Sequence, residues 1–231
     1  MQLIAVVPAA GFATRLQPLA VSKEMLVVRG RPMIDHLAER LLAAAPSRFR
    51  VVTRPDKSDL RAHAAAQNWE TILGSPTQVA QSVQLGLAGL ADDDLVLVGF
   101  PDTIIETEDA AVRTVAALSD DADAALGLFH SAEPERGDVV ELLPDGKVLR
   151  VEPKPRTPAG DLVWGLVAAR AGPLRELSTV TEPGHLWDRW ARNGRVTGVE
   201  LEGAYLDVGT PEALDAVDAS ARRRPAGSSG R

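Results

Sequence analysis

Wholly apolar runs along the chain alternate with segments in which apolar residues recur every three or four positions. Residues 3–7, closed by Pro8, and residues 95–100 are unbroken apolar runs, typical of strands buried on both faces. Between such runs, the spacing of Met33, Leu37 and Leu41 predicts a helix with one apolar side. Because strands separated by helices imply βαβ crossovers, the pattern predicts an α/β fold with a mixed, mostly parallel central sheet and helices on both faces.

The same patterns predict the remaining elements. Strands are expected at residues 49–52, 71–73, 124–129, 139–143, 148–151, 163–169 and 196–201. Helices are expected after Pro32, at residues 58–67, from a Thr77 cap, from Asp109 to residue 118, at residues 183–192 and after Pro211. The Pro144-Asp145-Gly146 turn predicts that residues 139–151 form a hairpin.

The chain has neither an internal repeat nor a recognisable linker. Residues 1–221 are therefore predicted to form a single domain. Residues 222–231 contain Arg-Arg-Arg-Pro and Gly-Ser-Ser-Gly and have no apolar face, so a disordered tail is expected there.

Composition removes several classes of protein. The 231 residues include 25 Lys and Arg against 32 Asp and Glu, a net charge of −7, which argues against a nucleic-acid partner. The absence of cysteine excludes disulfides, a thiolate nucleophile and cysteine-based metal sites. No apolar stretch reaches the roughly 18 residues of a membrane helix, and the start lacks the basic segment of a signal peptide. We expect a cytoplasmic protein without a membrane partner.

Candidate chemistry lies where two buried strands end, because ligands of open parallel sheets bind outside the carboxyl ends of the strands. The first strand leads into a small-residue loop followed by Arg15 and Lys23, which suit a bound phosphate. The strand ending at residue 100 leads into Asp102, which suits Mg²⁺. From the residues alone, Arg15 could equally be a solvated loop arginine and Asp102 a helix cap.

Other common sites are absent from the sequence. The loop is neither G-x-G-x-x-G nor a P-loop, and there is no Gly-x-Ser-x-Gly elbow. The scattered histidines and the close tryptophan pair are predicted to be structural or solvated: His36, His63, His130, His185, Trp187 and Trp190.

Five motifs follow one another along residues 3–217. They are Pro8-Ala9-Ala10-Gly11-Phe12-Ala13-Thr14-Arg15-Leu16 with Ser22-Lys23-Glu24-Met25-Leu26 and Gly30-Arg31-Pro32-Met33-Ile34; Gly99-Phe100-Pro101-Asp102-Thr103; Val139-Val140-Glu141 before Asp145-Gly146-Lys147-Val148; Glu152-Pro153-Lys154-Pro155; and Tyr205-Leu206-Asp207-Val208-Gly209-Thr210-Pro211-Glu212. In this order they resemble the sugar-1-phosphate nucleotidylyltransferases, which include the glucose-1-phosphate thymidylyltransferases and uridylyltransferases. The resemblance implies a Rossmann-like nucleotidyltransferase fold and a Mg²⁺-dependent reaction of an NTP with a phosphorylated acceptor that releases pyrophosphate.

The resemblance also implies residue roles. Arg15 would hold the leaving pyrophosphate, Lys23 would lie near the α-phosphate, and Asp102 and Asp207 would bind Mg²⁺. The remaining assignments are Ala9, Ala10, Gly11, Gln78 and Asp102 for the nucleotide and Asp138, Lys154 and Gly165 for the acceptor. Two structural readings stay open: Lys154 as a lysine of an extended linker and Asp207 as part of a turn that caps the last helix.

Four departures from the family pattern concern specificity. Ala13 stands where a glycine is usual, and its backbone is expected to need a positive φ. The segment from Arg15 to Lys23 is two residues short, and Leu73 replaces a base-binding glutamine, so that Gln78 either contacts the base or caps a helix. Asp138 replaces a glycine and Pro153 an acidic sugar contact. If Asp138 does not simply point to solvent, it suggests an acceptor that differs from glucose 1-phosphate, such as one with an amino or quaternary ammonium group.

Three functions are compatible with an α/β fold of this kind. The first is a nucleotidylyltransferase that uses a pyrimidine nucleotide (dTTP, UTP or CTP) and a sugar 1-phosphate, or a non-sugar acceptor such as an amino-alcohol phosphate. The second is a non-catalytic nucleotide-binding regulatory relative. The third, an NAD-dependent oxidoreductase, is disfavoured because the glycine fingerprint is missing. The subunit count stays open, a homo-oligomer included.

Overall fold

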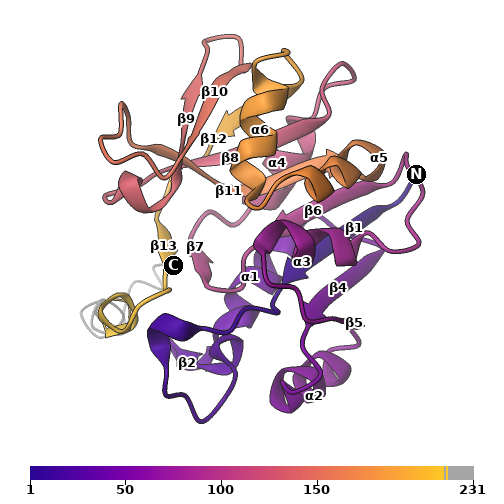
Figure 1. Ribbon diagram of the computed structural model, residues 1–231, viewed down its shortest axis with the longest axis vertical. Coiled ribbons are helices and arrows are strands. Elements are labelled where there is room, and N and C mark those ends of the chain that lie inside the picture. Colours follow the sequence, from indigo (N-terminus) through magenta and orange to yellow (C-terminus); the bar gives the residue numbers. More distant parts are fainter. Residues whose placement is uncertain (216, 218–231) are drawn as a thin grey trace, which may run out of the picture.

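The computed structural model describes residues 1–215 and 217, except for the side chain of Arg15, and within them the chain forms a nine-stranded sheet (Figure 1). The strands of this sheet are β1 (Leu3–Pro8), β4 (Arg48–Thr53), β5 (Glu70–Leu73), β6 (Leu95–Gly99), β8 (Ala124–His130), β9 (Asp138–Leu142), β10 (Val148–Pro153), β11 (Leu162–Arg170) and β12 (Val196–Glu200). Two small pairs stand apart, β2 (Val27–Val28) with β3 (Arg31–Pro32) and β7 (Thr103–Ile105) with β13 (Tyr205–Asp207). The tail predicted at residues 222–231 lies outside the described residues.

Helices and single helical turns connect these strands. The α-helices are α1 (Met33–Leu42), α2 (Ser58–Ala66), α3 (Val79–Gly86), α4 (Ala110–Ala116), α5 (Ala171–Leu174) and α6 (Pro183–Ala191). The 3₁₀ turns are η1 (Thr14–Leu16), η2 (Lys23–Met25), η3 (Pro134–Arg136) and η4 (Arg175–Thr179). Residues 211–215 are also helical, as expected after Pro211, and the Thr210 hydroxyl accepts the Ala213 amide at 3.3 Å.

The sheet is mixed, as the sequence predicts. β6, β1, β4 and β5 are neighbours and run parallel, so their carboxyl ends share one edge. β11 runs antiparallel to β6, and β9 and β10 form the expected hairpin.

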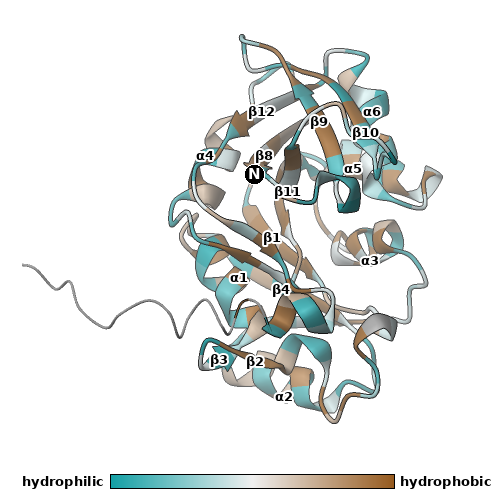
Figure 2. Ribbon diagram, turned by 90° about the vertical axis from the view of Figure 1, so that its left-hand side faces the viewer, coloured by the Kyte–Doolittle hydropathy of each residue, from teal (hydrophilic) through white to brown (hydrophobic). Residues whose placement is uncertain are grey.

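Alternate side chains of β1 serve two apolar layers. Ile4 and Val6 pack toward α3, α5 and α6, whereas Ala5 and Val7 pack toward α1, α2 and α4. The strands are accordingly hydrophobic between mixed or hydrophilic helices (Figure 2). Helices therefore cover both faces, and the predicted core tryptophans Trp187 and Trp190 are buried.

The sheet divides at β11. One edge of β11 pairs with β8 along its length, so β6 and β9 must share the other edge. Leu166 faces Gly99 of β6, whereas Val163 faces Val139 of β9. Trp164 and Gly165 therefore lie where β6 leaves β11 and β9 joins it. This fork separates the half that carries β1, β4 and β5 from the half that carries β9, β10 and α6 (Figure 1).

One predicted cap is wrong. α3 begins at Val79 after Gln78, whose backbone is extended (φ −135°, ψ 151°), whereas Thr77 lies one residue too early to cap it. The amide and hydroxyl of Thr77 donate instead to the side-chain oxygen of Gln81, at 3.1 and 3.3 Å. The threonine thus supports the first turn of the helix through Gln81.

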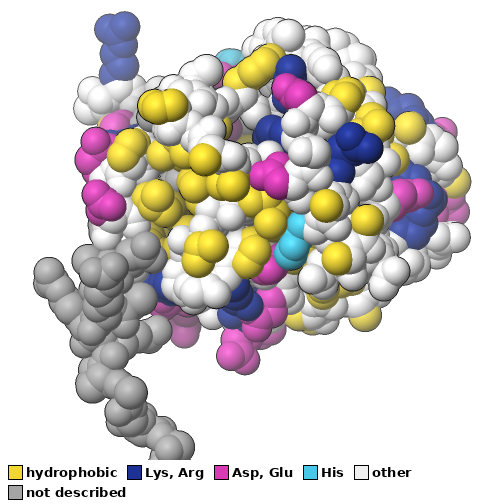
Figure 3. Space-filling view, turned by 90° about the horizontal axis from the view of Figure 1, so that it is seen from below, with side chains coloured by type: hydrophobic (Ala, Val, Ile, Leu, Met, Phe, Trp, Pro, Cys, Tyr) yellow, Lys and Arg dark blue, Asp and Glu magenta, His cyan; other side chains and the backbone are white. Residues whose placement is uncertain are grey.

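None of the helices in the described part of the chain combines the length and apolar character needed to cross a bilayer. On the face seen from below, acidic and basic side chains are interspersed with apolar ones (Figure 3).

Candidate active site

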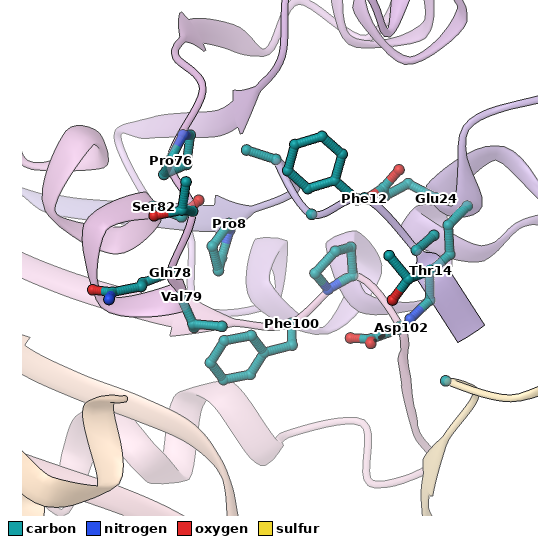
Figure 4. A pocket seen from close by; sticks show the side chains of 17 residues that line it. Pro8, Phe12, Thr14, Glu24, Pro76, Gln78, Val79, Ser82, Phe100 and Asp102 are labelled. Atoms are coloured by element: carbon teal, nitrogen blue, oxygen red, sulfur yellow. Dashed lines mark hydrogen bonds and ion pairs between the residues drawn. The ribbon is translucent and has the colours of Figure 1, made fainter. Parts of the chain in front are cut away.

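A cavity of about 360 Å³ opens at the shared carboxyl edge of β1 and β6. α3 contributes Gln78, Val79 and Ser82 to one side, and Phe12, Thr14, Glu24 and Asp102 lie on the other, with Pro8 and Phe100 between them (Figure 4). The remaining lining residues are Ala10, Gly11, Ala13, Lys23, Pro76, Thr77, Pro101 and Gly209. Ala10, Gly11, Lys23, Gln78 and Asp102 were all predicted as site residues from the sequence, and the structure gathers them around one space.

The loop after β1 adopts the backbone expected from the sequence. Ala13 has φ 52° and ψ 38°, in the left-handed region where its methyl group costs energy that glycine would not. Ala9 is buried: its amide donates to the Val52 carbonyl at 2.8 Å, and its carbonyl accepts the Lys57 ammonium at 2.8 Å. Ala9 therefore anchors the loop, while Ala10, Gly11 and Ala13 face the cavity.

Lys23 and Asp102 form an ion pair in the cavity wall. The Lys23 Nζ lies 2.6 Å from Asp102 Oδ2, and the Lys23 side chain is only 12% exposed. η2 carries the lysine and the segment after β6 carries the aspartate, so the pair joins the two strand-end loops that the sequence singled out. Asp102 precedes β7 and caps no α-helix, which removes its alternative reading.

Asp207 lies next to this pair. It faces Thr103 in the β13–β7 ladder, and the amide of the following residue, Val208, donates to the Asp102 carbonyl at 2.8 Å. Asp207 belongs to a strand, and Thr210 provides the cap of the last helix. The two aspartates predicted as metal ligands therefore come from adjacent backbone segments.

The adjacent backbone positions of Asp102 and Asp207 are compatible with two carboxylates that could share a divalent cation with a bound phosphate. Among the described residues there is no group of three side chains that could hold a metal ion. Mg²⁺ characteristically takes one or two carboxylates and completes its shell with water and substrate phosphates. Asp102 and Asp207 would hold such an ion, which would neutralise phosphate charge.

Gln78, directly before α3, and Ser82, within it, bring two polar side chains to the cavity. Gln78 occupies the N-cap position of α3, but its side chain makes no capping hydrogen bond, so that side chain is available to a ligand. The Ser82 hydroxyl is buried and has no hydrogen-bond partner within the described chain. Both residues line the cavity, so both side chains are available to the same bound group. Ser82 was missed from sequence, since one serine in an apolar helix gives no signal.

A buried ion pair behind the loop was also missed. The Lys57 ammonium contacts both Glu24 oxygens, at 2.8 and 2.9 Å. Burial raises the pKa of the Glu24 carboxyl, and Lys57 opposes the shift. Ser22 donates from its amide and hydroxyl to Asp59 at 2.6 and 2.5 Å. α2 thus holds the segment that carries Lys23.

Across the fork, Asp138 is buried rather than solvent-facing, so its solvent reading is wrong. Its Oδ2 accepts the Trp164 indole N–H at 3.1 Å, and Trp164 contacts Phe100 edge-on at 5.5 Å between ring centres. Burial raises the pKa of the Asp138 carboxyl. Asp138 is thus linked through two aromatic rings to the cavity wall.

The other predicted acceptor residues lie in the same half. Lys154 is 54% exposed, has φ 43° and forms an ion pair with Glu182 at 2.5 Å. Gly165 lies at the fork, and a Cβ there would come within 2.4 Å of the Tyr205 ring. Burial and the carboxylates of Asp207, Asp102 and Asp138 raise the pKa of the Tyr205 hydroxyl. The side chain of Arg15 lies outside what the structure describes.

The fold and the site together define an α/β nucleotidyltransferase. Residues 5–191 match the MobA-like NTP transferase domain. N-acetylmuramate alpha-1-phosphate uridylyltransferase of Caulobacter vibrioides is 32% identical over 237 residues, covering 94% of this chain and 96% of that protein. Glucose-1-phosphate thymidylyltransferase of Streptomyces antibioticus is 28% identical, covering 89% of this chain and 62% of that enzyme.

Solved structures confirm the fold. A Bacillus anthracis structure, described as a glucose-1-phosphate thymidylyltransferase with sucrose, has a TM-score of 0.82 at 19% identity and covers 98% of each chain. The chain belongs to the MobA-like NTP transferase family, and the expected nucleotidyltransferase class is confirmed.

Proposed function

We propose that this chain transfers a nucleotidyl group from a pyrimidine nucleoside triphosphate to a sugar 1-phosphate and releases pyrophosphate. The observation that carries the proposal is the Lys23–Asp102 pair in the cavity wall with Asp207 on the adjoining strand. The Caulobacter relative, aligned over nearly the whole chain, is named for such a reaction on N-acetylmuramate α-1-phosphate.

The proposed reaction needs positioning and charge stabilisation. A phosphate oxygen of the acceptor forms a bond to the α-phosphorus, and the bond from that phosphorus to the β-bridging oxygen breaks in line. Pyrophosphate leaves with the electron pair, so no protein nucleophile is needed. Lys23 would stabilise charge at the α-phosphate, and Arg15 would do so at the leaving pyrophosphate. A divalent cation held by Asp102 and Asp207 would reduce repulsion between the phosphates.

The two substrates would occupy the two sides of the fork. Ala10 and Gly11 present loop backbone to the phosphates, and Gln78 with Ser82 offers polar groups to the base. Lys154 would exchange its contact with Glu182 for the acceptor phosphate, while Asp138 and Gly165 would border the sugar. A cavity wall of prolines, Val79 and Phe100 would bury the apolar surface of the nucleotide.

Pyrophosphate release tests the proposal. The purified chain would be mixed with Mg²⁺, each of dTTP, UTP and CTP, and a panel of sugar 1-phosphates, and the coupled product identified. Lys23→Ala should lower kcat by at least about a hundredfold, because it removes a cation beside the reacting phosphate. The control is Lys147→Ala, because Lys147 is half exposed and its one ion pair among the described residues, with Asp121, is long at 4.0 Å. Nucleotide binding without pyrophosphate release under every condition would instead indicate a non-catalytic relative.

A further inference from the structure

Asp138 has an oxygen for which the fold provides no partner. The side chain is only 8% exposed. Trp164 occupies Oδ2, whereas Oδ1 is buried and has no hydrogen-bond partner in the described part of the chain. An unpaired buried carboxylate oxygen costs free energy, so an oxygen left in this state needs an explanation.

The neighbouring charges do not supply that partner. Lys154, Glu182 and His185 all influence the carboxyl group electrostatically. The Lys154 ammonium is bonded to Glu182, and within the described chain His185 gives Oδ1 of Asp138 no hydrogen bond. If Lys154 turned to an acceptor phosphate, the carboxylates of Asp138 and Glu182 would remain beside the acceptor. This side of the fork would then favour a group that donates hydrogen bonds or carries positive charge.

The surrounding backbone is shaped around the carboxylate. Gly184, in the first turn of α6, lies so close that a Cβ there would be 2.1 Å from Asp138 Oδ2. On the other side, Asp138 faces Pro153 in the β9–β10 ladder. Asp138 also lies beside Trp164 at the fork, next to the aromatic wall of the cavity. The carboxylate is therefore held in a fixed place on the side of the fork that we assign to the acceptor.

We propose that Oδ1 of Asp138 selects the acceptor by accepting a hydrogen bond from an N–H group, so that the preferred acceptor is a phosphate ester bearing an amine or amide nitrogen. This rests on the proposed function and narrows its substrate class. A carboxylate can only accept hydrogen bonds, and an amide or ammonium N–H can only donate them, so the two groups are complementary. A sugar hydroxyl can both donate and accept, and it gains less from an acceptor-only partner.

The variant Asp138→Asn tests this polarity directly. The indole N–H of Trp164 must still meet an oxygen, so the amide oxygen should take the place of Oδ2 and the amide nitrogen that of Oδ1. The group that meets the acceptor then becomes a donor, while shape and the Trp164 contact are kept. Glu141→Gln is the matched control, because Glu141 is exposed on the same strand and 4.0 Å from Arg150.

The measurement is kcat/KM for glucosamine 1-phosphate, N-acetylglucosamine 1-phosphate, glucose 1-phosphate and phosphoethanolamine with one fixed NTP. The parent and Glu141→Gln should prefer a nitrogen-bearing acceptor over glucose 1-phosphate. Asp138→Asn should reduce that preference about tenfold to a hundredfold, the range of a hydrogen bond to a charged group. The KM for the NTP should stay unchanged.

Each outcome decides a separate point. Glucose 1-phosphate as the best acceptor, or an unchanged preference in Asp138→Asn, overturns the inference. Preference for phosphoethanolamine supports the role of Asp138 and refutes a sugar acceptor. If the NTP raises the Tm but no acceptor is turned over, the proposed function fails. The inference is then decided by comparing the Tm shifts that the nitrogen-bearing acceptors and glucose 1-phosphate induce. Gly184→Ala gives a second test, because its methyl group would displace the carboxylate and should weaken the same preference.

Discussion

At the residue scale, the carboxylates of the site differ in the partners that the fold gives them. Asp102 is paired with Lys23 and Glu24 with Lys57, whereas Asp138 has one oxygen on an indole and one without a partner in the described chain. A group that is left unsatisfied in this way lowers the stability of the free protein. Site geometry and stability therefore conflict at Asp138.

That conflict predicts a pH-dependent gain in stability for Asp138→Asn. Burial raises the pKa of Asp138, so its contribution to stability is full below the unfolded pKa of about 3.9 and is lost as pH rises through the folded pKa. At pH 7 the free energy of unfolding of the variant should therefore exceed that of the parent by about 1–2 kcal/mol, because a neutral amide costs less to bury than a carboxylate. The difference should shrink toward pH 4. Urea unfolding across this range measures it, and a parent that is more stable at pH 7 would contradict the prediction.

Asp207→Asn should alter the use of Mg²⁺ without altering the fold. Replacing one of two proposed carboxylate ligands by a neutral amide weakens the attraction for a divalent cation. The Mg²⁺ concentration for half-maximal rate should rise by about tenfold or more, with an unchanged Tm. Glu202→Gln, an exposed change in the same region, is the control. An unchanged Mg²⁺ dependence would count against Asp207 as a ligand.

The sequence predicted the conformation or role of single residues where a motif specifies it, and did not predict it where contacts between distant segments determine it. The positive φ of Ala13 was expected because the resembled family usually has a glycine at this position. The pairing of Lys57 with Glu24, over 33 positions, depends on how α2 packs on η2 and leaves no local pattern. The same holds for Ser82 and for the burial of Asp138. These residues were missed or left open for that reason.

At the element scale, α2 holds the loop that carries Lys23. Lys57 donates to Ala9 and Glu24, and Asp59 accepts from Ser22, so one helix start joins the loop after β1 to η2. Glu24 lines the cavity, and the other partners in these contacts support its wall. Their loss should affect both stability and the placement of Lys23.

Lys57→Met should destabilise the chain by about 3–5 kcal/mol, because it leaves the Glu24 carboxylate buried without its partner. Adding Glu24→Gln should restore most of that loss by removing the isolated charge. Chemical unfolding of the parent, both single variants and the double variant forms the complete cycle. Equal losses in Lys57→Met and the double variant would show that the pair does not act as a unit.

Element types were predictable because buried strands and one-sided helices leave periodic patterns. All nine strands of the main sheet lie where apolar runs placed them, and their boundaries differ by one or two residues. The short ladders β2–β3 and β7–β13 were not predicted, since two or three residues give no periodicity. The β7–β13 ladder brings Asp207 to Asp102, so this part of the site followed from the resemblance and not from pattern.

At the scale of the whole molecule, a nucleotide should stabilise the fold only together with a cation. A ligand at 100 times its Kd adds about 2.7 kcal/mol, which corresponds to roughly 5–10 °C in Tm for a chain of this size. We expect UTP, dTTP or CTP with Mg²⁺ to give such a shift, and excess EDTA to remove most of it. A shift that persists in EDTA would contradict the role given to Asp102 and Asp207.

The forked sheet has a consequence for how such a protein can diversify. The hairpin β9–β10 is a contiguous segment attached along one edge of β11, and it supplies both Asp138 and the approach to Lys154. The first half of the chain supplies most of the cavity wall. Replacing this hairpin by that of a relative could therefore change the acceptor specificity and leave the nucleotide-binding residues unchanged.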